Sequence, residues 1–343
     1  MKTTVLDSLN AGLLSALDRD ETVHLLGEDI LDPYGGAFKV TRGCSTAHPR
    51  RVWAAPISEA GLAGVAAGMA LRGLRPVLEI MFGDFTTLLA DQLINHISKF
   101  RWMYNNTVRL PLVIRTPMGG RRGYGPTHSQ TLEKLYLGVP GLRVIAPTNF
   151  VEDIPSQSPG QLLANCILDT EDPILFIENK LQYLLPLYGA NGQPQLEIRR
   201  YEDDLKDGVS TPAYVVRVKG APPPTVTMVA YGYMADMAHQ AMIKLAYEEE
   251  IVAELVVMTR LAPFDPGALL ESVRRTSKLV TIEEGGLTLG WGTELIARLV
   301  ELLPGRLAAA RVAARDLPVP AALSLEQAVL PQMCDILRTV RKV

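Results

Sequence analysis

Hydrophobic and polar residues alternate along the first half of the chain in blocks that have the lengths of strands and helices. Short apolar runs that end in polar turns predict strands at 23–29, 75–82, 110–116, 142–147 and 172–178. Apolar residues recur at helical spacing in the N-terminal segment and over 57–73 and 84–104. Strands separated by helices predict an α/β fold built on a doubly wound, mostly parallel sheet.

The second half of the chain repeats this alternation after an interruption. Residues 186–224 contain turn-rich stretches on both sides of the charged segment "RRYEDDLKDG", which indicates a linker. Beyond it the pattern predicts strands at 226–232, 251–258, 278–285 and about 307–313, and helices at about 234–249, 266–276, 291–302 and from about 325. We therefore expect a domain at 1–190, a linker at 191–224 and a second, smaller α/β domain at 225–343.

Composition narrows the class of protein. The 343 residues are 48% hydrophobic and 21% charged, which is typical of a globular protein with a large core. A net charge of −3 without a basic run argues against binding to nucleic acid or a membrane surface. Three distant cysteines, Cys44, Cys166 and Cys334, predict free thiols. The N-terminus lacks the unbroken apolar core of a secretory signal, so we expect a cytoplasmic protein.

A single carboxylate, Glu59, stands at the head of the apolar helix expected over 57–73. One interpretation is a first-turn acid that complements the helix dipole, which is worth about 0.3–1 kcal/mol. The alternative is a buried carboxylate in a binding site, because the neighbouring residues are small and the helix is apolar on nearly every face. Such a carboxylate must be paired or share a proton. The local sequence leaves both interpretations open.

The Gly-rich segment "MGGRRGYGPTHSQ" at 118–130 follows an expected strand. It therefore lies at the carboxyl edge of the sheet, where ligands bind in open α/β folds. Its His128 is the histidine best placed for general acid–base work. His24 and His96 fall in regular elements and are interpreted as structural, whereas His48 and His239 are expected at the surface. A flexible surface loop with solvated arginines is the alternative.

The stretches "RVWAAPISEAGLAGVAAGMALRGLRPVLEIMFGDF", "DQLINHISKFRWMY", "GPTHSQTLEKLYLGVPGLRVIAPTN", "DPILFIENK" and "TRLAPFDPGALLESVRRTSKLVTIEEG" follow one another along the chain. In this order they resemble the β subunits of thiamine-diphosphate-dependent 2-oxo acid dehydrogenases, such as those acting on pyruvate, branched-chain 2-oxo acids and acetoin. The resemblance covers nearly the whole chain. It implies a pyrimidine-binding domain followed by a transketolase-type C-terminal domain.

The resemblance implies roles for residues at matching motif positions. Glu59, in "PISEAG", would hydrogen-bond N1′ of the cofactor's aminopyrimidine and so help to activate the cofactor toward a 2-oxo acid. Phe85 matches the aromatic contact to this ring, and Ile57 and Met81 fall near the same pocket. His128 matches the active-site histidine, which would steady negative charge on intermediates or the acceptor. The acyl group would then pass to a lipoyl-bearing acyltransferase component.

One half of the implied cofactor site is missing from the sequence. Thiamine enzymes hold the diphosphate through Mg²⁺ bound by a G-D-G motif and a downstream Asn pair, which "GDF" at 83–85 and "NN" at 105–106 do not reproduce. The resemblance implies that a separate α subunit supplies this half in an α₂β₂ heterotetramer, so that the chain is inactive alone. Some members also bind a monovalent cation such as K⁺, which would here involve Leu112, Cys166, Ile167 and Asp169.

The chain also departs from the family pattern. Ala54 stands where aspartate is common, "CSTAHPRR" replaces a stretch with glycine and acids, and residues 150–173 are longer than typical. Arg121 and Arg122 either meet an anionic acceptor or the lipoyl domain, or they are solvated. These features keep open a second function, half of a split transketolase-type carboligating transferase. A catalytically silent assembly subunit is the third.

Overall fold

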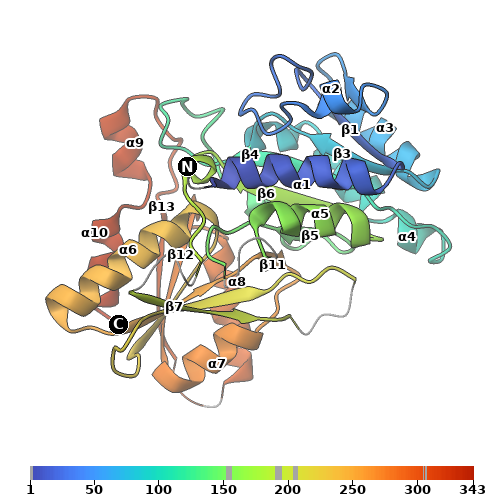
Figure 1. The fold of residues 1–343 in the computed structure, drawn as a ribbon. Coiled ribbons are helices and arrows are strands. Elements are labelled where there is room, and N and C mark those ends of the chain that lie inside the picture. The colour runs from blue at the N-terminus through green and yellow to red at the C-terminus, as the bar shows by residue number, and fades with distance from the viewer. Residues whose placement is uncertain (1–2, 152–156, 190–194, 204–207, 304, 306) are drawn as a thin grey trace.

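The computed structural model describes residues 3–151, 157–189, 195–203, 208–303, 305 and 307–343. These residues form two α/β units, the first coloured blue to green and the second yellow to red in Figure 1. The first sheet consists of β1 (Val23–Gly27), β2 (Val52–Ala54), β3 (Arg75–Glu79), β4 (Val113–Met118), β5 (Arg143–Ile145), β6 (Ile174–Asn179) and β11 (Arg260–Ala262). Its strand order is β11-β5-β6-β4-β3-β1-β2, and only β11 pairs antiparallel. The predicted α/β class is confirmed.

Helices cover both faces of the first sheet because the parallel strands are apolar on both sides. The helices of this unit are α1 (Val5–Arg19), α2 (Cys44–Ala47), α3 (Glu59–Leu71), α4 (Phe100–Met103) and α5 (Pro159–Asp169). Leu78 and Ile114 pack in one core with the buried face of α3. Val77 and Val113 point the other way and pack with α1 and α5. The alternation along each strand thus builds two cores around one sheet.

Helices α1 and α5 lie side by side, as Figure 1 shows. Two glycines make this contact close: a Cβ added to Gly12 would lie 2.2 Å from the carbonyl oxygen of Gly160. A Cβ on Gly160 would lie 1.8 Å from the carbonyl oxygen of Ser8. The Gly160 amide also donates to the Ser8 hydroxyl at 3.0 Å. The two backbones therefore touch with no room for a side chain between them.

The second sheet has the order β13-β12-β9-β10-β8-β7. Its strands are β7 (Leu196–Tyr201), β8 (Ala213–Val218), β9 (Val226–Ala230), β10 (Ala253–Val257), β12 (Lys278–Gly286) and β13 (Ala308–Ala314). Its helices are α6 (Gly232–Glu249), α7 (Gly267–Thr276), α8 (Trp291–Leu302), α9 (Leu323–Val329) and α10 (Met333–Val340). Met228 packs with α6 and α10, whereas Val229 packs with α7 and α8, which cover the opposite face.

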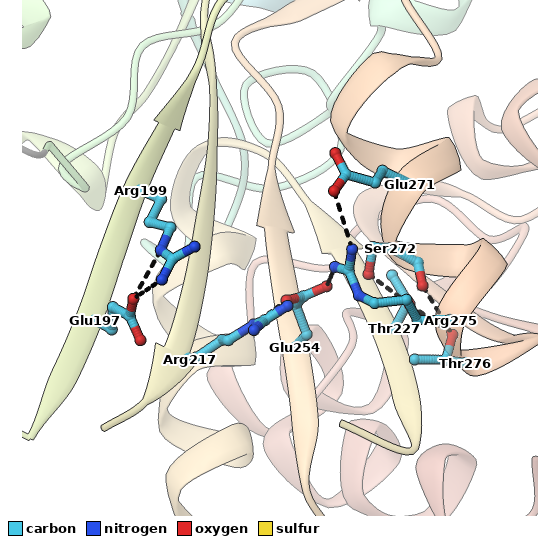
Figure 2. Close-up of polar contacts among 9 residues, drawn as sticks. All are labelled: Glu197, Arg199, Arg217, Thr227, Glu254, Glu271, Ser272, Arg275 and Thr276. Carbon is cyan, nitrogen blue, oxygen red and sulfur yellow. Dashed lines mark hydrogen bonds and ion pairs between the residues drawn. The ribbon is translucent and has the colours of Figure 1, made fainter. Parts of the chain in front are cut away.

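Ion pairs around the buried Glu254 join α7 to this sheet (Figure 2). The fully buried Glu254 of β10 accepts hydrogen bonds from Arg217 of β8 and, at 2.5 Å, from Arg275 of α7. Beside it the Thr227 hydroxyl lies 2.7 Å from that of Ser272 on α7. Burial alone would raise the pKa of Glu254, but the hydrogen bonds from Arg217 and Ser272 outweigh it and hold this pKa below its usual value.

The expected linker at 191–224 is wrong over two segments, because β7 and β8 form the antiparallel edge of the second sheet. Charged residues on the outward face of β7 hid its alternation from the sequence pattern. Residues 190–194 and 204–207 of this region lie outside the described residues. Helix α5 was missed as well. The exact domain boundaries stay predictions.

The single helix expected over 84–104 is also wrong. The segment divides into a 3₁₀-helix η1 (Gly83–Thr87), a π-helix η2 (Gln92–Ile97) and α4. The hydroxyl of Thr86 donates to the Gly83 carbonyl and that of Ser98 donates to the Ile94 carbonyl, so side chains compete with regular backbone pairing here. The C-terminal helix is likewise two helices, α9 and α10, with Pro331 between them.

Candidate active site

The carboxyl ends of five neighbouring parallel strands bring the candidate residues to one edge of the first sheet. The order β6-β4-β3-β1-β2 and its register align Gly27 with Ala54 and with Glu79. Ligands bind at this edge in open α/β sheets. The segments that leave the strands there carry Glu28 after β1, Ile57 and Glu59 after β2, Met81 and Phe85 after β3, His128 after β4, and Lys180 after β6.

Glu59 is buried at the start of α3, with 6% of its surface exposed. Its carboxylate forms no hydrogen bond or ion pair with the described residues. Ile57, two residues before Glu59, is 83% exposed. Of the two interpretations that the sequence left open, the structure therefore favours a buried carboxylate over a solvated acid at the helix end.

A second carboxylate, Glu28, lies close to Glu59 and was not predicted. Its Oε1 accepts a hydrogen bond from the Ser58 amide at 3.2 Å. Burial raises the pKa of Glu28, and the nearby charge of Glu59 adds to the rise, while the Ser58 hydrogen bond opposes it. The site thus contains two neighbouring buried acids. An acid directly after a buried strand, as in "HLLGED", was the available signal.

His128 lies in an aromatic cluster with Phe82 and Phe85. The ring centroids of His128 and Phe82 are 4.9 Å apart and those of His128 and Phe85 are 5.2 Å apart, both edge to face. The Thr127 hydroxyl lies 3.0 Å from His128 Nδ1. His128, Phe85 and the preceding Met81 are all half-buried. The structure thus brings two of the predicted candidates, Phe85 and His128, into contact. Phe82, which was not predicted, lies in the same cluster.

The two arginines of the Gly-rich loop have different environments. Arg121 is mostly buried: its Nε lies 3.6 Å from Glu284 Oε2, and its guanidinium carbon lies 5.7 Å from the Tyr233 ring centroid. Arg121 is therefore not solvated, which makes that expectation wrong, and a contact with an acceptor or the lipoyl domain stays a prediction. Arg122 is exposed, and its guanidinium carbon lies 6.0 Å from the ring centroids of Phe38 and of Tyr124.

His239 is buried, contrary to the expected surface position. It lies on α6, and its ring centroid is 5.4 Å from that of Phe150 and 5.5 Å from that of Tyr188. Burial lowers its pKa, which the charge of Asp236 opposes. His239 therefore belongs to the packing between α6 and the end of the first unit.

The residues expected at a monovalent cation lie around the C-terminal end of α5. Cys166 and Ile167 are buried there, and Asp169 is exposed as the last residue of the helix. Leu112 precedes β4, and its carbonyl accepts the Ile174 amide at 2.9 Å. The Ile167 carbonyl accepts a hydrogen bond from Arg75 at 3.0 Å. Among the described residues, no cluster of three His, Cys, Asp or Glu could hold a metal ion. The cation stays a prediction.

The described helices include none that is both long and apolar enough to cross a membrane. Cys44 and Cys166 are buried free thiols, and Cys334 is exposed. The cytoplasmic location stays a prediction.

Both halves of the chain match known domain families. Residues 2–184 match the pyrimidine-binding domain of transketolase, and residues 215–336 match the transketolase C-terminal domain. The fold and this pair of matches define a transketolase-type protein.

Full-length relatives are more specific. The chain is 35% identical over 342 residues to pyruvate dehydrogenase E1 component subunit beta-1, mitochondrial, of Arabidopsis thaliana, covering 99% of this chain and 88% of the relative. The human pyruvate dehydrogenase E1 component subunit beta is 32% identical, with 100% and 90% covered. The chain therefore belongs to the family of β subunits of thiamine-diphosphate-dependent 2-oxo acid dehydrogenases.

A solved structure shares the fold. It is described as a split gene transketolase, an inactive beta4 tetramer, and superposes with a TM-score of 0.72 over 98% of this chain and 96% of its own. At 21% sequence identity, this likeness shows the fold alone.

Proposed function

We propose that this chain acts with an α subunit to decarboxylate a small 2-oxo acid, and that Glu59 activates the cofactor. The observation that carries the proposal is the buried Glu59 carboxylate, which lacks a partner among the described residues. A buried acid without a partner is costly unless a ligand group completes it. A ring nitrogen able to exchange a proton is such a group, and the exposed Ile57 beside Glu59 leaves access to it.

These residues fit an aminopyrimidine. Thiamine diphosphate, when bound, supplies the carbon nucleophile and the electron sink that decarboxylation needs. Glu59 would hold and move the proton at the ring nitrogen, and Glu28, whose own pKa burial raises, lies beside it. Phe85 would contact the ring, with Ile57 and Met81 lining the same pocket. His128 would steady negative charge that develops on the substrate or the acceptor.

The proposed partners follow from the family and from the missing motif. An α subunit would hold the diphosphate and Mg²⁺ in an α₂β₂ heterotetramer, and a lipoyl-bearing acyltransferase component would receive the acyl group. The names of the relatives, as β subunits of an E1 component, support a second subunit. K⁺ binding near Leu112, Cys166, Ile167 and Asp169 belongs to the same proposal.

The test is co-expression with a candidate α subunit and an assay of 2-oxo acid decarboxylation with an artificial electron acceptor. We expect turnover only with both chains and thiamine diphosphate present. Glu59→Gln should assemble normally and lose roughly 100-fold or more in kcat, the usual scale of general acid–base catalysis. Glu294→Gln, at an exposed position on α8, is the matched control. Turnover by the chain alone, or an unchanged kcat in Glu59→Gln, would refute the proposal.

The same preparation separates the remaining alternatives. If the assembled enzyme joins the unit left after decarboxylation to an aldehyde acceptor, and does not transfer it to a lipoyl domain, the chain is half of a carboligating transferase. If neither reaction occurs although cofactor binds, the chain is an assembly subunit.

A further inference from the structure

The Gly-rich loop that carries His128 is held from both units by buried charged side chains whose polar atoms face the loop's backbone. The loop runs from Gly119 to His128. Lys180 holds it from the first unit, and Glu284 and Glu326 hold it from the second. Lysine and glutamate are seldom fully buried unless they are paired. Three such side chains around one loop therefore indicate a specific role for their contacts with it.

Lys180 follows β6 and is completely buried. Its ammonium donates to the carbonyl of Gly119 at 2.7 Å and to the carbonyl of His128 at 2.6 Å. It also lies 5.0 Å from the centroid of the Phe82 ring, which contacts His128. Burial lowers the pKa of Lys180 to about 8, while the charges of Asp84 and Glu284 oppose this. One side chain thus fixes the first and last residues of the loop.

Glu284 and Glu326 bind the amides at the start of the loop. Glu284 Oε1, on β12, accepts from the Gly120 amide at 2.6 Å. Glu326, on α9, accepts from the Arg121 amide at 2.7 Å and from the Gly123 amide at 3.2 Å. Hydrogen bonds to charged acceptors are shorter and stronger than neutral ones. The second unit therefore grips this part of the loop through its backbone.

The loop fits these side chains closely. Gly119 has a φ of +93°, and a Cβ there would lie 2.5 Å from Asn179 Nδ2 and 2.9 Å from Glu284 Oε1. A Cβ on Gly120 would lie 2.7 Å from Leu330 Cδ1. The glycines let the backbone approach the carboxylates and the lysine directly.

From this geometry we infer that Lys180, Glu284 and Glu326 are positioning residues that set the loop, and hence His128, against Phe82 and Phe85. Glu284 and Glu326 belong to the second unit, whereas the strand ends that form the candidate site belong to the first. The second unit thereby helps to set the position of His128. The consequence for catalysis rests on the proposed function. The hydrogen bonds that fix the loop do not depend on that function.

The first experiment measures the hold on the loop without activity. Hydrogen exchange of the amides of Gly120, Arg121 and Gly123 is followed by mass spectrometry on the full chain, together with tryptic cleavage after the exposed Arg122. Glu326→Ala should speed both by roughly tenfold or more, with Glu326→Gln in between because its amide oxygen still accepts. Lys180→Met should do the same, since it leaves the Gly119 and His128 carbonyls without this donor. Lys278→Met and Glu294→Gln, both at exposed positions, are the controls.

The second experiment uses the assembled enzyme. Lys180→Met and Glu326→Ala should lower kcat at least tenfold and leave cofactor affinity within about twofold, because Glu59 and its neighbours are untouched. Wild-type protection of the loop in these variants would overturn the inference. So would equal loss of protection throughout the chain, because that indicates general destabilisation. If no variant, wild type included, decarboxylates 2-oxo acids, the proposed function fails, while the exchange data still decide the inference.

Discussion

Replacing Glu133 by glutamine should stabilise the protein at neutral pH, because the wild-type carboxyl group is buried away from water. Glu133 begins the 3₁₀-helix η3 (Glu133–Leu135) and is completely buried, like Glu283 on β12. Burial raises the pKa of Glu133 to about 8, and the charge of Glu283 adds to the rise. Burial likewise raises the pKa of Glu283 to about 7, although hydrogen bonds from the Gly292 and Trp291 amides oppose it.

The sign and size of the effect follow from these values. Below pH 4.5 the Glu133 carboxyl is protonated in both folded and unfolded chains and does not affect stability. Between pH 4.5 and about 8 the unfolded chain releases the proton and the folded chain keeps it, so the free energy of unfolding falls as pH rises. At 1.36 kcal/mol for each pH unit, the cost reaches about 3 kcal/mol at pH 7. Glutamine has no proton to release and avoids this cost.

Urea unfolding at about pH 5, 7 and 8 measures the difference. Glu133→Gln should gain little over the wild type at pH 5 and about 3 kcal/mol at pH 7, with the slope m unchanged. Glu294→Gln, at an exposed position, controls for loss of a charge. Free energies of unfolding that run parallel for wild type and Glu133→Gln across this pH range would refute the argument.

Two further substitutions, each with a control, test the helix packing and the ion pairs of the buried Glu254. Gly12→Ala should lower the free energy of unfolding by about 3 kcal/mol, because its Cβ meets the backbone of α5 at 2.2 Å. Gly68→Ala, which has no atom near the added Cβ, should not lower the free energy of unfolding. Glu254→Gln should cost about 2 kcal/mol in thermal unfolding, against under about 0.5 kcal/mol for the half-exposed Glu271→Gln. Equal effects within either pair would contradict these contacts.

The fold was predictable from the sequence where both faces of a strand are buried. The runs at 75–82 and 226–232 are mostly apolar, and they became the interior strands β3 and β9. Prediction failed at the edge of the second sheet, where Glu197 and Arg199 share the solvent-facing side of β7 and resemble loop residues. It also failed over 84–104, because apolar spacing alone does not distinguish one helix from three short turns that side-chain hydroxyls interrupt.

The candidate site was predictable in its parts and not in its assembly. The motif match placed Phe85 and His128 in the site, and the structure puts their rings in contact. Glu28 and Lys180 were missed, although both follow buried strands, because only the strand order shows that their strands neighbour the others. Arg121 could not be assigned, since its partner Glu284 lies 163 positions further along the chain. Local sequence carries no signal for such a pair.

The exposure pattern around Glu59 argues that this edge of the chain is an incomplete site. A buried carboxylate and an 83% exposed isoleucine two residues apart are a poor arrangement for a finished surface, since one is desolvated and the other is hydrated. Covering the edge with a second chain would remove Ile57 from water, and a ligand held there would give Glu59 its partner. Assembly with the second chain and its ligand would therefore remove both the exposure of Ile57 and the lack of a partner for Glu59. This is why we expect cofactor affinity and assembly with the α subunit to rise together, as linked equilibria must.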